Sequence, residues 1–472
     1  MKMNHADKVD AIAQKVRAYY ATKTPFRIYH GTTNSTRVVS FDRDKMVDTS
    51  ELNQVVHVDT EKQIVVVEPS VPMDQLVKET LKYGLIPPVV TEFPGITVGG
   101  AIQGGAIESS SFRWGTFNQT AISIEMVLAN GDVVTVSPEE HADLFYGSAG
   151  SYGTFGIITS ATVQLVPAKR YVTLTTHAVT SFADCLETTN RFIASSVDFV
   201  ESAMLEKGLG SVVVGSMSDK IVGKKMRFSR AWNPWYYMYI EKVTRAKHQV
   251  TVTMPLKDYL FRYDRGAFWA AEFAFRQSGI PFNAFTRFIL NPILKTRKLY
   301  QAVQQSAAGQ KFVCQDIAMP ARTLVEFMDF VDQELGTYPT GYCAVKADDR
   351  SPLLFSGIKG VEQVYSVGVY GLRISEYDKF VTLNRKLEKA THRLGGRKWF
   401  YAHTYYTEDE FWSIYDKKWY DSLRKKYHAE TLPSVTDKII VREHYEVRTR
   451  RAALKAVVSK PKLRINDDET HP

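Results

Sequence analysis

Hydrophobic positions recur along the chain with two different periods, which separates expected helices from expected strands. Val9, Ile12, Ala13 and Val16 repeat every three or four residues between Lys and Arg, which predicts a helix over 6–20. The same period predicts further helices, and period-two or continuous apolar runs bounded by turn residues predict strands. The further helices are 73–83, 322–335 and 377–394, and the strands are 26–29, 55–58, 64–68, 156–166, 171–178, 211–215 and 361–369.

Turn signals join some of these segments into hairpins. Asn130-Gly131-Asp132 lies between two short apolar runs, 127–129 and 133–136, and Asn-Gly is a strong signal for a two-stranded hairpin. Asp59 to Lys62 joins two strands in the same way. The glycine-rich composition ends at Pro167, so we expect an α+β protein divided into residues 1–168, 169–430 and a basic C-terminal extension, 431–472.

Composition and charge exclude several classes of protein. The 472 residues are 44% hydrophobic, which is ordinary for a globular chain, and three cysteines are too few for a disulfide scaffold or a four-cysteine zinc site, so we expect no metal. The net charge is +9, but the stretch from Lys438 to Arg464 holds nine Lys and Arg against Glu443 and Glu446. We therefore expect no nucleic-acid partner; such a tail serves solubility, partner docking or peripheral contact with an anionic membrane.

Targeting signals are not evident in the sequence. The first residues carry charges without an apolar core of signal-peptide length, and no window of about 18 apolar residues is free of charge. We expect a cytoplasmic protein whose contact with an intracellular membrane, if made, is peripheral and runs through the basic tail. The oligomeric state is left open.

Glycine clusters are the main chemical signal. A P-loop and a dinucleotide-binding G-x-G-x-x-G are both missing from the sequence. Gly31 to Thr36 follows a short strand with one glycine and five small polar residues, which can turn N–H groups and hydroxyls toward a diphosphate. Pro94 to Ile102 places Gly99 and Gly100 at an expected helix start, where free N–H groups favour an anion. Glycines at 147, 150, 153 and 156 allow close approach of a flat ligand or of a neighbouring strand.

The order of these motifs resembles the FAD domain of the vanillyl-alcohol oxidase / p-cresol methylhydroxylase superfamily. Glu108 to Gly115, Asp143 to Tyr146 and Val166 to Val172 are similar to the sterol delta-24-reductase (Diminuto-like) family within it. The likeness continues through Gln315-Asp316, Tyr401-Ala402, Glu410-Phe411-Trp412 and Leu423 to Tyr427. The chain departs from the family at His403, where the animal pattern has aspartate, and at Phe112 and Trp114, where histidine and tyrosine are usual.

The resemblance implies a two-subdomain PCMH-type FAD-binding domain over 1–168 and an α+β cap and substrate domain over 169–430. It also implies FAD as cofactor. No cysteine occurs before Cys185, and His30 lies just outside the anion loop, so non-covalent FAD is expected, with a covalent link through His30 left open. The residues expected to bind the cofactor are Gly31, Thr32, Thr33, Asn34, Ser35, Thr36, Pro94, Gly95, Thr97, Val98, Gly99, Gly100, Gly104, Gly105, Ser109, Ser110, Gly115, Gly156, Ile157 and Ile158.

The activity implied by the resemblance is a flavin-dependent oxidoreduction. The leading hypothesis is reduction of a C=C bond in a hydrophobic, sterol- or isoprenoid-like small molecule, with NADPH as donor. An FAD-dependent oxidase or dehydrogenase of an alcohol or sugar lactone is the alternative, and a flavin-binding scaffold without turnover is a third.

Two aromatic segments carry the remaining candidates. If 399–406 is a strand, Tyr401, His403 and Tyr405 share one face and are candidate proton-transfer residues; the alternative is a structural aromatic strand. The aromatic stretch 232–239 is either core or an apolar lid over the substrate.

Overall fold

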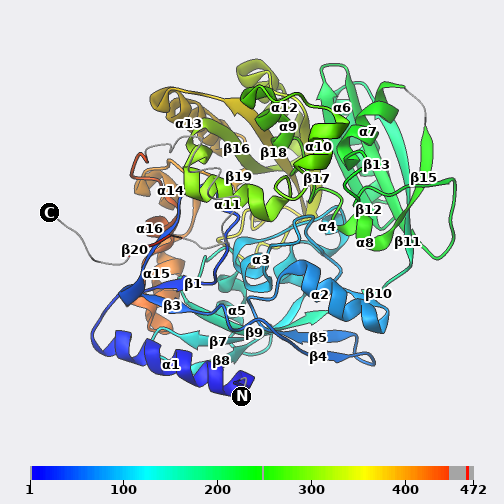
Figure 1. Cartoon of the computed structure of the whole chain (residues 1–472). Coiled ribbons are helices and arrows are strands. Elements are labelled where there is room, and N and C mark those ends of the chain that lie inside the picture. Colours follow the sequence, from blue (N-terminus) through cyan, green and yellow to red (C-terminus); the bar gives the residue numbers. More distant parts are fainter. Residues whose placement is uncertain (1–2, 247–248, 446–463, 467–472) are drawn as a thin grey trace.

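A computed structural model describes residues 3–246, 249–445 and 464–466. Within these residues two large sheets dominate the architecture, a five-stranded one in the N-terminal part and a nine-stranded one in the middle of the chain (Figure 1). Helices and sheets both contribute, which confirms the α+β fold class. Among the described residues, no helix combines the length and the apolar character needed to cross a bilayer.

The five-stranded sheet is antiparallel throughout. Its predicted hairpins are confirmed, because Asn130-Gly131-Asp132 joins two of its strands and the 59–62 turn joins two others. The strand order is β4 (Val55–Asp59), β5 (Ile64–Val67), β9 (Gly156–Gln164), β7 (Ala121–Leu128) and β8 (Val133–Val136).

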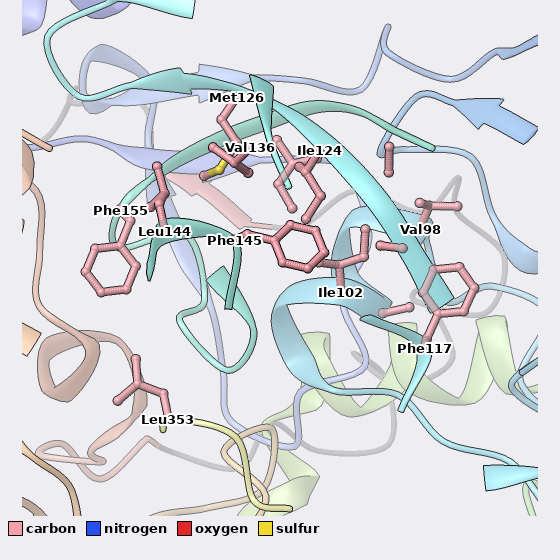
Figure 2. Packing of buried hydrophobic residues seen from close by; sticks show 14 of the residues in the cluster. Val98, Ile102, Phe117, Ile124, Met126, Val136, Leu144, Phe145, Phe155 and Leu353 are labelled. Carbon is pink, nitrogen blue, oxygen red and sulfur yellow. The ribbon is translucent and has the colours of Figure 1, made fainter. Parts of the chain in front are cut away.

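One face of this sheet packs on a short helix that the sequence predicted to begin near Gly99. Helix α3 (Val98–Gly104) buries Val98 and Ile102 against Phe117, Ile124 and Phe145 (Figure 2). The contact fixes the helix start and the following glycines relative to the sheet. The other helical segments of this region are α1 (His5–Ala21), α2 (Met73–Thr80), α4 (Ser111–Trp114) and α5 (Ala142–Ser148), with short 3₁₀ turns η1 (Arg43–Lys45), η2 (Leu81–Tyr83) and η3 (Phe117–Thr120).

Three two-stranded sheets lie outside the two large ones. The strand β1 (Arg27–Tyr29), which directly precedes the predicted anion loop, pairs in parallel with β3 (Met46–Asp48), which follows the loop. The others pair β6 (Leu85–Ile86) with β10 (Val166–Pro167), and β2 (Ser40–Asp42) with β20 (Arg464–Asn466). Apart from Arg464–Asn466, the basic stretch after Tyr445 lies outside the described residues.

The nine-stranded sheet forms the cap region. Its strand order is β14 (Lys224–Lys225), β15 (Val250–Pro255), β11 (Tyr171–Val179), β13 (Leu209–Ser218), β12 (Phe199–Glu206), β17 (Thr340–Lys346), β18 (Gln363–Arg373), β16 (Phe312–Pro320) and β19 (Arg397–Lys398). Its helices are α6 (Phe182–Ile193), α7 (Tyr236–Arg245), α8 (Leu256–Leu260), α9 (Ala270–Ser278), α10 (Ala284–Ile289), α11 (Thr296–Ser306), the 3₁₀ turn η4 (Ala308–Lys311), α12 (Ala321–Leu335) and α13 (Tyr377–Arg393).

After the cap, the chain returns to the first region. Helices α14 (Glu408–Ile414), α15 (Lys417–Lys426) and α16 (Val435–Ile439), with the turn η5 (Ala429–Thr431), contribute Phe411, Leu423 and Ile439 to the same core as the five-stranded sheet (Figure 1). The division at residues 168 and 430 stays a prediction. The packing nevertheless shows that the last helices on both sides of residue 430 belong with the first core.

Candidate cofactor-binding and active site

The predicted anion loop, Gly31 to Thr36, directly follows β1 and leaves donors free. Gly31 has a φ of +81° and no atom within 4 Å of the position that a Cβ would take, so glycine both permits the turn and leaves space beside it. Within the described chain, the N–H groups of Gly31 to Asn34 donate to no protein acceptor. The loop therefore presents successive free donors, as an anion-binding turn does.

Three cations near this loop, the buried Arg37 and the half-buried Arg27 and Lys438, have no carboxylate in ion-pair contact in the described part of the chain. Arg27, Arg37 and Lys438 form no ion pair within the described residues. Burial lowers the pKa of Arg37 to about 10 and that of Lys438 to about 7, because little surrounds these charges to compensate for lost water. A bound diphosphate would supply the missing negative charge.

Four buried polar atoms beside the loop also have no hydrogen-bond partner in the described structure. They are His30 Nδ1, Gln103 Nε2, Tyr152 Oη and Thr154 Oγ1. A Cβ at Gly153 would lie 3.6 Å from Gln103, and one at Gly104 would lie 3.9 Å from Tyr152 Oη, so these atoms come from adjoining segments. Because buried polar atoms are normally paired, the four atoms fit a ligand such as FAD.

The start of helix α3 differs from the sequence interpretation. Its N–H groups are already used: Val98 donates to Val71 O at 2.9 Å, and Gly99 to Pro69 O at 2.8 Å. Gly100 N donates to the Thr97 side chain that caps the helix. The interpretation of free N–H groups over a diphosphate is therefore wrong. Gly99 is required instead by packing, since a Cβ there would lie 2.8 Å from Pro69 Cβ.

The four glycines spaced by three residues serve close packing between segments. A Cβ at Gly156 would lie 2.7 Å from Val127 O of β7, and one at Gly150 would lie 2.7 Å from the Leu353 backbone. Gly156 to Ile158 pair with β7, whereas β5 pairs with β9 only from Ala161 onward. The other backbone edge of Gly156, Ile157 and Ile158 is thus not paired in a described sheet, and their cofactor role stays a prediction.

The remaining predicted cofactor residues have protein partners. Ser109 Oγ is 2.8 Å from Tyr259 Oη, and Ser110 Oγ donates to Pro88 O at 2.8 Å. Pro94 O accepts from Arg297 at 2.9 Å, and a Cβ at Gly95 would meet the same side chain. At Gly115 a Cβ would meet Gln119, while Gly105 O accepts from Trp399 at 3.0 Å. Their contact with FAD stays a prediction.

Residues 399–406 do not form the strand that we expected. Residues 400–402 make a turn, and Thr404 makes only an isolated bridge to Ile440. The carbonyls that a strand would pair are bound instead by Thr36 of the anion loop and by the next residue, Arg37. Arg37 donates to Phe400 O and Ala402 O, and Thr36 N donates to Tyr401 O at 3.0 Å.

The three predicted catalytic side chains consequently have different surroundings. His403 Nδ1 is 2.9 Å from Thr36 Oγ1, and burial near Arg37 lowers its pKa to about 3. This imidazole is neutral at physiological pH and is unsuited to a relay near pH 7. Tyr405 stacks on the His403 ring, with a centroid distance of 6.2 Å. Tyr401 instead directs its phenol toward the cap sheet, and the catalytic roles of all three stay predictions.

Tyr401 meets a buried carboxyl group that our site prediction missed. Tyr401 Oη donates to Asp316 Oδ2 at 2.5 Å, and Tyr370 Oη donates to Asp316 Oδ1 at 2.5 Å. Burial raises the pKa of Asp316 to about 6, although the two phenol hydrogen bonds lower it. The group can therefore gain and lose a proton near neutral pH, as proton-transfer residues must.

The strand pattern explains how the three residues meet. In β16, Val313 and Ile317 face the cap core, so Cys314 and Asp316 point to the opposite face. Asp316 lies opposite Gly368 of β18, and the Tyr370 ring lies over that glycine, where a side chain would block it. Tyr370 and Asp316 are 54 residues apart, so no local motif reveals the pair.

Aromatic rings form an apolar wall beside Asp316. Phe268 stacks near Tyr370 with centroids 6.4 Å apart, and against Tyr263 at 3.9 Å. Phe93 lies 5.7 Å from Phe268 and 5.8 Å from Tyr300. The carboxyl group is thus next to a surface suited to a hydrophobic molecule.

A second buried charge cluster joins the two regions. The fully buried Arg262 lies 2.6 Å from Glu108, 2.8 Å from Glu201 and 3.7 Å from Glu92. Burial and the nearby Glu108 raise the pKa of Glu92 to about 8, so this carboxyl keeps its proton at neutral pH. Glu92 and Glu108 precede the cap, so the cluster holds the cap against the first region.

Arg37 and Lys438 are further residues that the sequence analysis missed. Arg37 directly follows the predicted loop, and a basic residue at that position is the feature of the sequence from which its role could have been predicted. Lys438 Nζ donates to Tyr152 O at 2.9 Å and to Gly153 O at 3.2 Å, while Arg424 donates to Thr154 O at 3.3 Å. Helices α15 and α16 therefore fix the 152–154 segment through hydrogen bonds to its backbone carbonyls.

Comparison with known proteins shows an FAD-binding family. Residues 4–137 match a family described as an FAD binding domain. The Delta(24)-sterol reductases of Macaca fascicularis and Homo sapiens are each 30% identical over 417 residues, which is 86% of this chain and 80% of each relative. The Delta(24)-sterol reductase of Rattus norvegicus is 29% identical over 449 residues, 92% of this chain and 86% of that protein. The similarity therefore extends well beyond the FAD-binding region.

Proposed function

Because the chain belongs to the Delta(24)-sterol reductase family, we propose that it reduces a C=C bond of a hydrophobic, sterol- or isoprenoid-like substrate. The family resemblance is confirmed, and the chain is an FAD-dependent oxidoreductase of this type. NADPH as the electron donor and the identity of the olefin are parts of the proposal. The observation that carries it is the Asp316 carboxyl group held between the phenols of Tyr370 and Tyr401.

Reduction of an isolated C=C bond needs a hydride at one carbon and a proton at the other. Bound FAD supplies the hydride transfer chemistry, accepting two electrons from the donor and passing them on. This chain has to supply the proton. Asp316 has a pKa of about 6, and Tyr370 and Tyr401 contact both of its oxygens, so the three residues can hold and deliver a proton to the olefin.

The placement of Tyr401 connects this group to the cofactor site. Its carbonyl accepts from Thr36 in the anion loop, while its phenol reaches Asp316. Trp399, two residues earlier, donates to Gly104 O at 3.1 Å, next to the orphaned Tyr152 Oη. The proposed proton donor therefore adjoins the segments that we assign to FAD, and the aromatic wall of Phe268 and Tyr263 would position an apolar substrate.

The test is a pair of anaerobic half-reactions followed by flavin absorbance. NADPH is expected to bleach the flavin, and a Δ24-unsaturated sterol is expected to restore its colour. Bleaching by an alcohol or a sugar lactone, with no response to NADPH, would contradict the reductase and favour the oxidative alternative. A flavin that responds to none of them would indicate a scaffold without turnover.

A further inference from the structure

An exposed apolar surface lies on the cap, away from the proposed reaction site. Phe285, Phe288 and Ile289 of α10 are 70%, 50% and 55% exposed, and Trp232 is 67% exposed. Large apolar side chains gathered on a surface commonly mark an interaction site. We define the apolar surface as these four residues. The aromatic stretch 232–239, expected to be either core or a lid, is divided: Trp235, Tyr236 and Tyr237 are core, whereas Trp232 is exposed.

The two segments of the apolar surface are held together by a buried arginine. Arg265 donates to Asn291 Oδ1 at 2.9 Å, just after α10, and to Ala231 O and Asn233 O at 2.9 and 3.1 Å, on either side of Trp232. Beneath α10, Phe282 packs on Trp235 with centroids 5.5 Å apart and on Phe275 at 5.3 Å. The exposed rings are thus carried by a packed base, and α10 lies in the green part of the cap (Figure 1).

The segment that follows Glu272 and carries α10 is basic, and Glu272 itself is paired with Arg276. From Phe273 to Gln315 the sequence contains six Lys and Arg and no Asp or Glu. Arg230, Arg287 and Lys295 have no carboxylate partner within the described residues, whereas Arg297 is paired with Asp74. Apolar rings flanked by unpaired cations match the interface of a bilayer, where apolar groups enter the lipid and cations meet anionic headgroups.

An aromatic row leads from beneath this surface toward Asp316. Trp235 and Tyr237 have centroids 6.0 Å apart, Tyr237 and Trp269 5.1 Å, and Trp269 and Phe268 6.4 Å. Phe268 in turn lies beside Tyr370, which contacts Asp316. The row therefore begins at Trp235, which packs on Phe282 next to α10, and ends at the aromatic wall beside Asp316.

We propose that the apolar surface docks on an anionic lipid bilayer, so that a hydrophobic substrate is delivered from the lipid to the cap. The delivery step rests on the proposed function, but the docking step does not. The surface differs from the C-terminal basic stretch that the sequence analysis considered. It uses apolar insertion as well as charge, so salt should weaken the binding without abolishing it.

The experiment is flotation of the full-length, FAD-loaded protein with sterol-free vesicles. Vesicles of phosphatidylcholine alone are compared with vesicles that also contain phosphatidylserine. The wild type is expected to bind the anionic vesicles, and F285S/F288S is expected to lower the partition coefficient at least tenfold. The matched control is V56S/Y83S, which changes two apolar residues of similar exposure (49% and 54%) on the first region and should bind like the wild type.

A second measurement reports on Trp232 directly. Brominated lipid should quench part of the tryptophan fluorescence of the wild type, and W232F should remove that part. NADPH-dependent flavin bleaching should be unchanged in F285S/F288S, which separates docking from the proposed function. If bleaching fails but vesicle binding holds, the proposed activity is contradicted and the docking surface is not.

Three results would overturn the docking proposal. The first is absence of wild-type binding to anionic vesicles at low salt. The second is full binding by F285S/F288S with loss in R448Q/R450Q/R451Q, which would place the contact on the C-terminal basic stretch. The third is a wild-type dimer in sedimentation that F285S/F288S dissociates, with no vesicle binding, which would make the surface an interface between copies.

Discussion

Tyr401 connects the anion loop with the proposed proton donor: its carbonyl accepts a hydrogen bond from Thr36 N at 3.0 Å, and its phenol donates one to Asp316 at 2.5 Å. Tyr401 is thus a single residue that contacts both the anion loop and Asp316.

Replacing Asp316 with Asn should leave FAD bound and lower steady-state turnover by about 10²- to 10⁴-fold, the usual loss when a general acid is removed. Reduction of the flavin by NADPH needs no such acid and should change little, whereas reoxidation by the olefin should slow. Stopped-flow absorbance measures both steps. The control is D378N on the surface of α13; equal rates in D316N and wild type would remove Asp316 from the reaction.

The olefin-dependent step should fall as pH rises through about 6, because Asp316 must be protonated to donate and burial raises its pKa to about that value. Tyr401→Phe removes a hydrogen bond that lowers this pKa, so the fall should move to higher pH. The measurement is the rate of flavin reoxidation between pH 5 and 9. A profile that is identical in wild type and Y401F would contradict the assignment.

Acid or heat should release yellow FAD into the supernatant, because we expect the flavin to be bound non-covalently. No cysteine precedes Cys185, and His30 is a neutral imidazole whose pKa is lowered by burial and whose Nδ1 has no hydrogen-bond partner in the described structure. His30→Ala should still bind FAD. A precipitate that stays yellow in the wild type and loses its colour in H30A would establish a covalent link through that imidazole.

Replacing Arg37 with Met, or Lys438 with Met, should weaken FAD binding by about ten- to a hundredfold, because each removes a buried or half-buried cation beside the free donors of the loop. Fluorescence titration of the apoprotein with FAD measures the dissociation constant. Lys425→Met, an exposed lysine of α15, is the matched control. Unchanged affinity in both test variants, with normal thermal melting, would show that these cations do not serve the diphosphate.

Gly99→Val should destabilise the protein by about 1–3 kcal/mol, because its side chain meets Pro69 in a packed contact. Gly100→Ala should be tolerated, since this position is exposed and meets only Thr97 Oγ1, at 3.1 Å. Thermal melting of the apoproteins distinguishes the two. If G99V melts like the wild type and yet binds no FAD, the glycine faces the ligand after all.

Local signals in the sequence were sufficient for much of the fold. The Asn130-Gly131 turn and the helix ending at Gly84 depend on neighbours in the sequence, and both are confirmed. Residues 399–406 alternate in aromatic character, yet they form no strand because Arg37 and Thr36, more than 360 residues away, bind their carbonyls. The small polar residues of Gly31 to Thr36 indicated a segment in which the N–H groups of Gly31 to Asn34 have no protein acceptor in the described chain, and its binding of an anion stays a prediction.

The proposed proton donor could not be located in the same way. Asp316, Tyr370 and Tyr401 meet only because β16 and β18 pair in one register and Tyr401 is held by the anion loop. Sequence alternation indicates which residues of a strand share a face, but it does not indicate which strand lies beside it. The apolar surface of α10 was missed for a related reason, since its aromatic residues resemble core residues until their exposure is known.

The return of the chain to its first core also determines when the cofactor can bind during synthesis. The segment 152–154 is held by Arg424 and Lys438, which leave the ribosome after the whole cap has been made. A nascent chain that ends before α15 has the glycine segments but lacks the cations and helices behind them. We therefore expect the flavin to load only after α15 and α16 have been made, and we expect a chain that ends before α15 to be colourless.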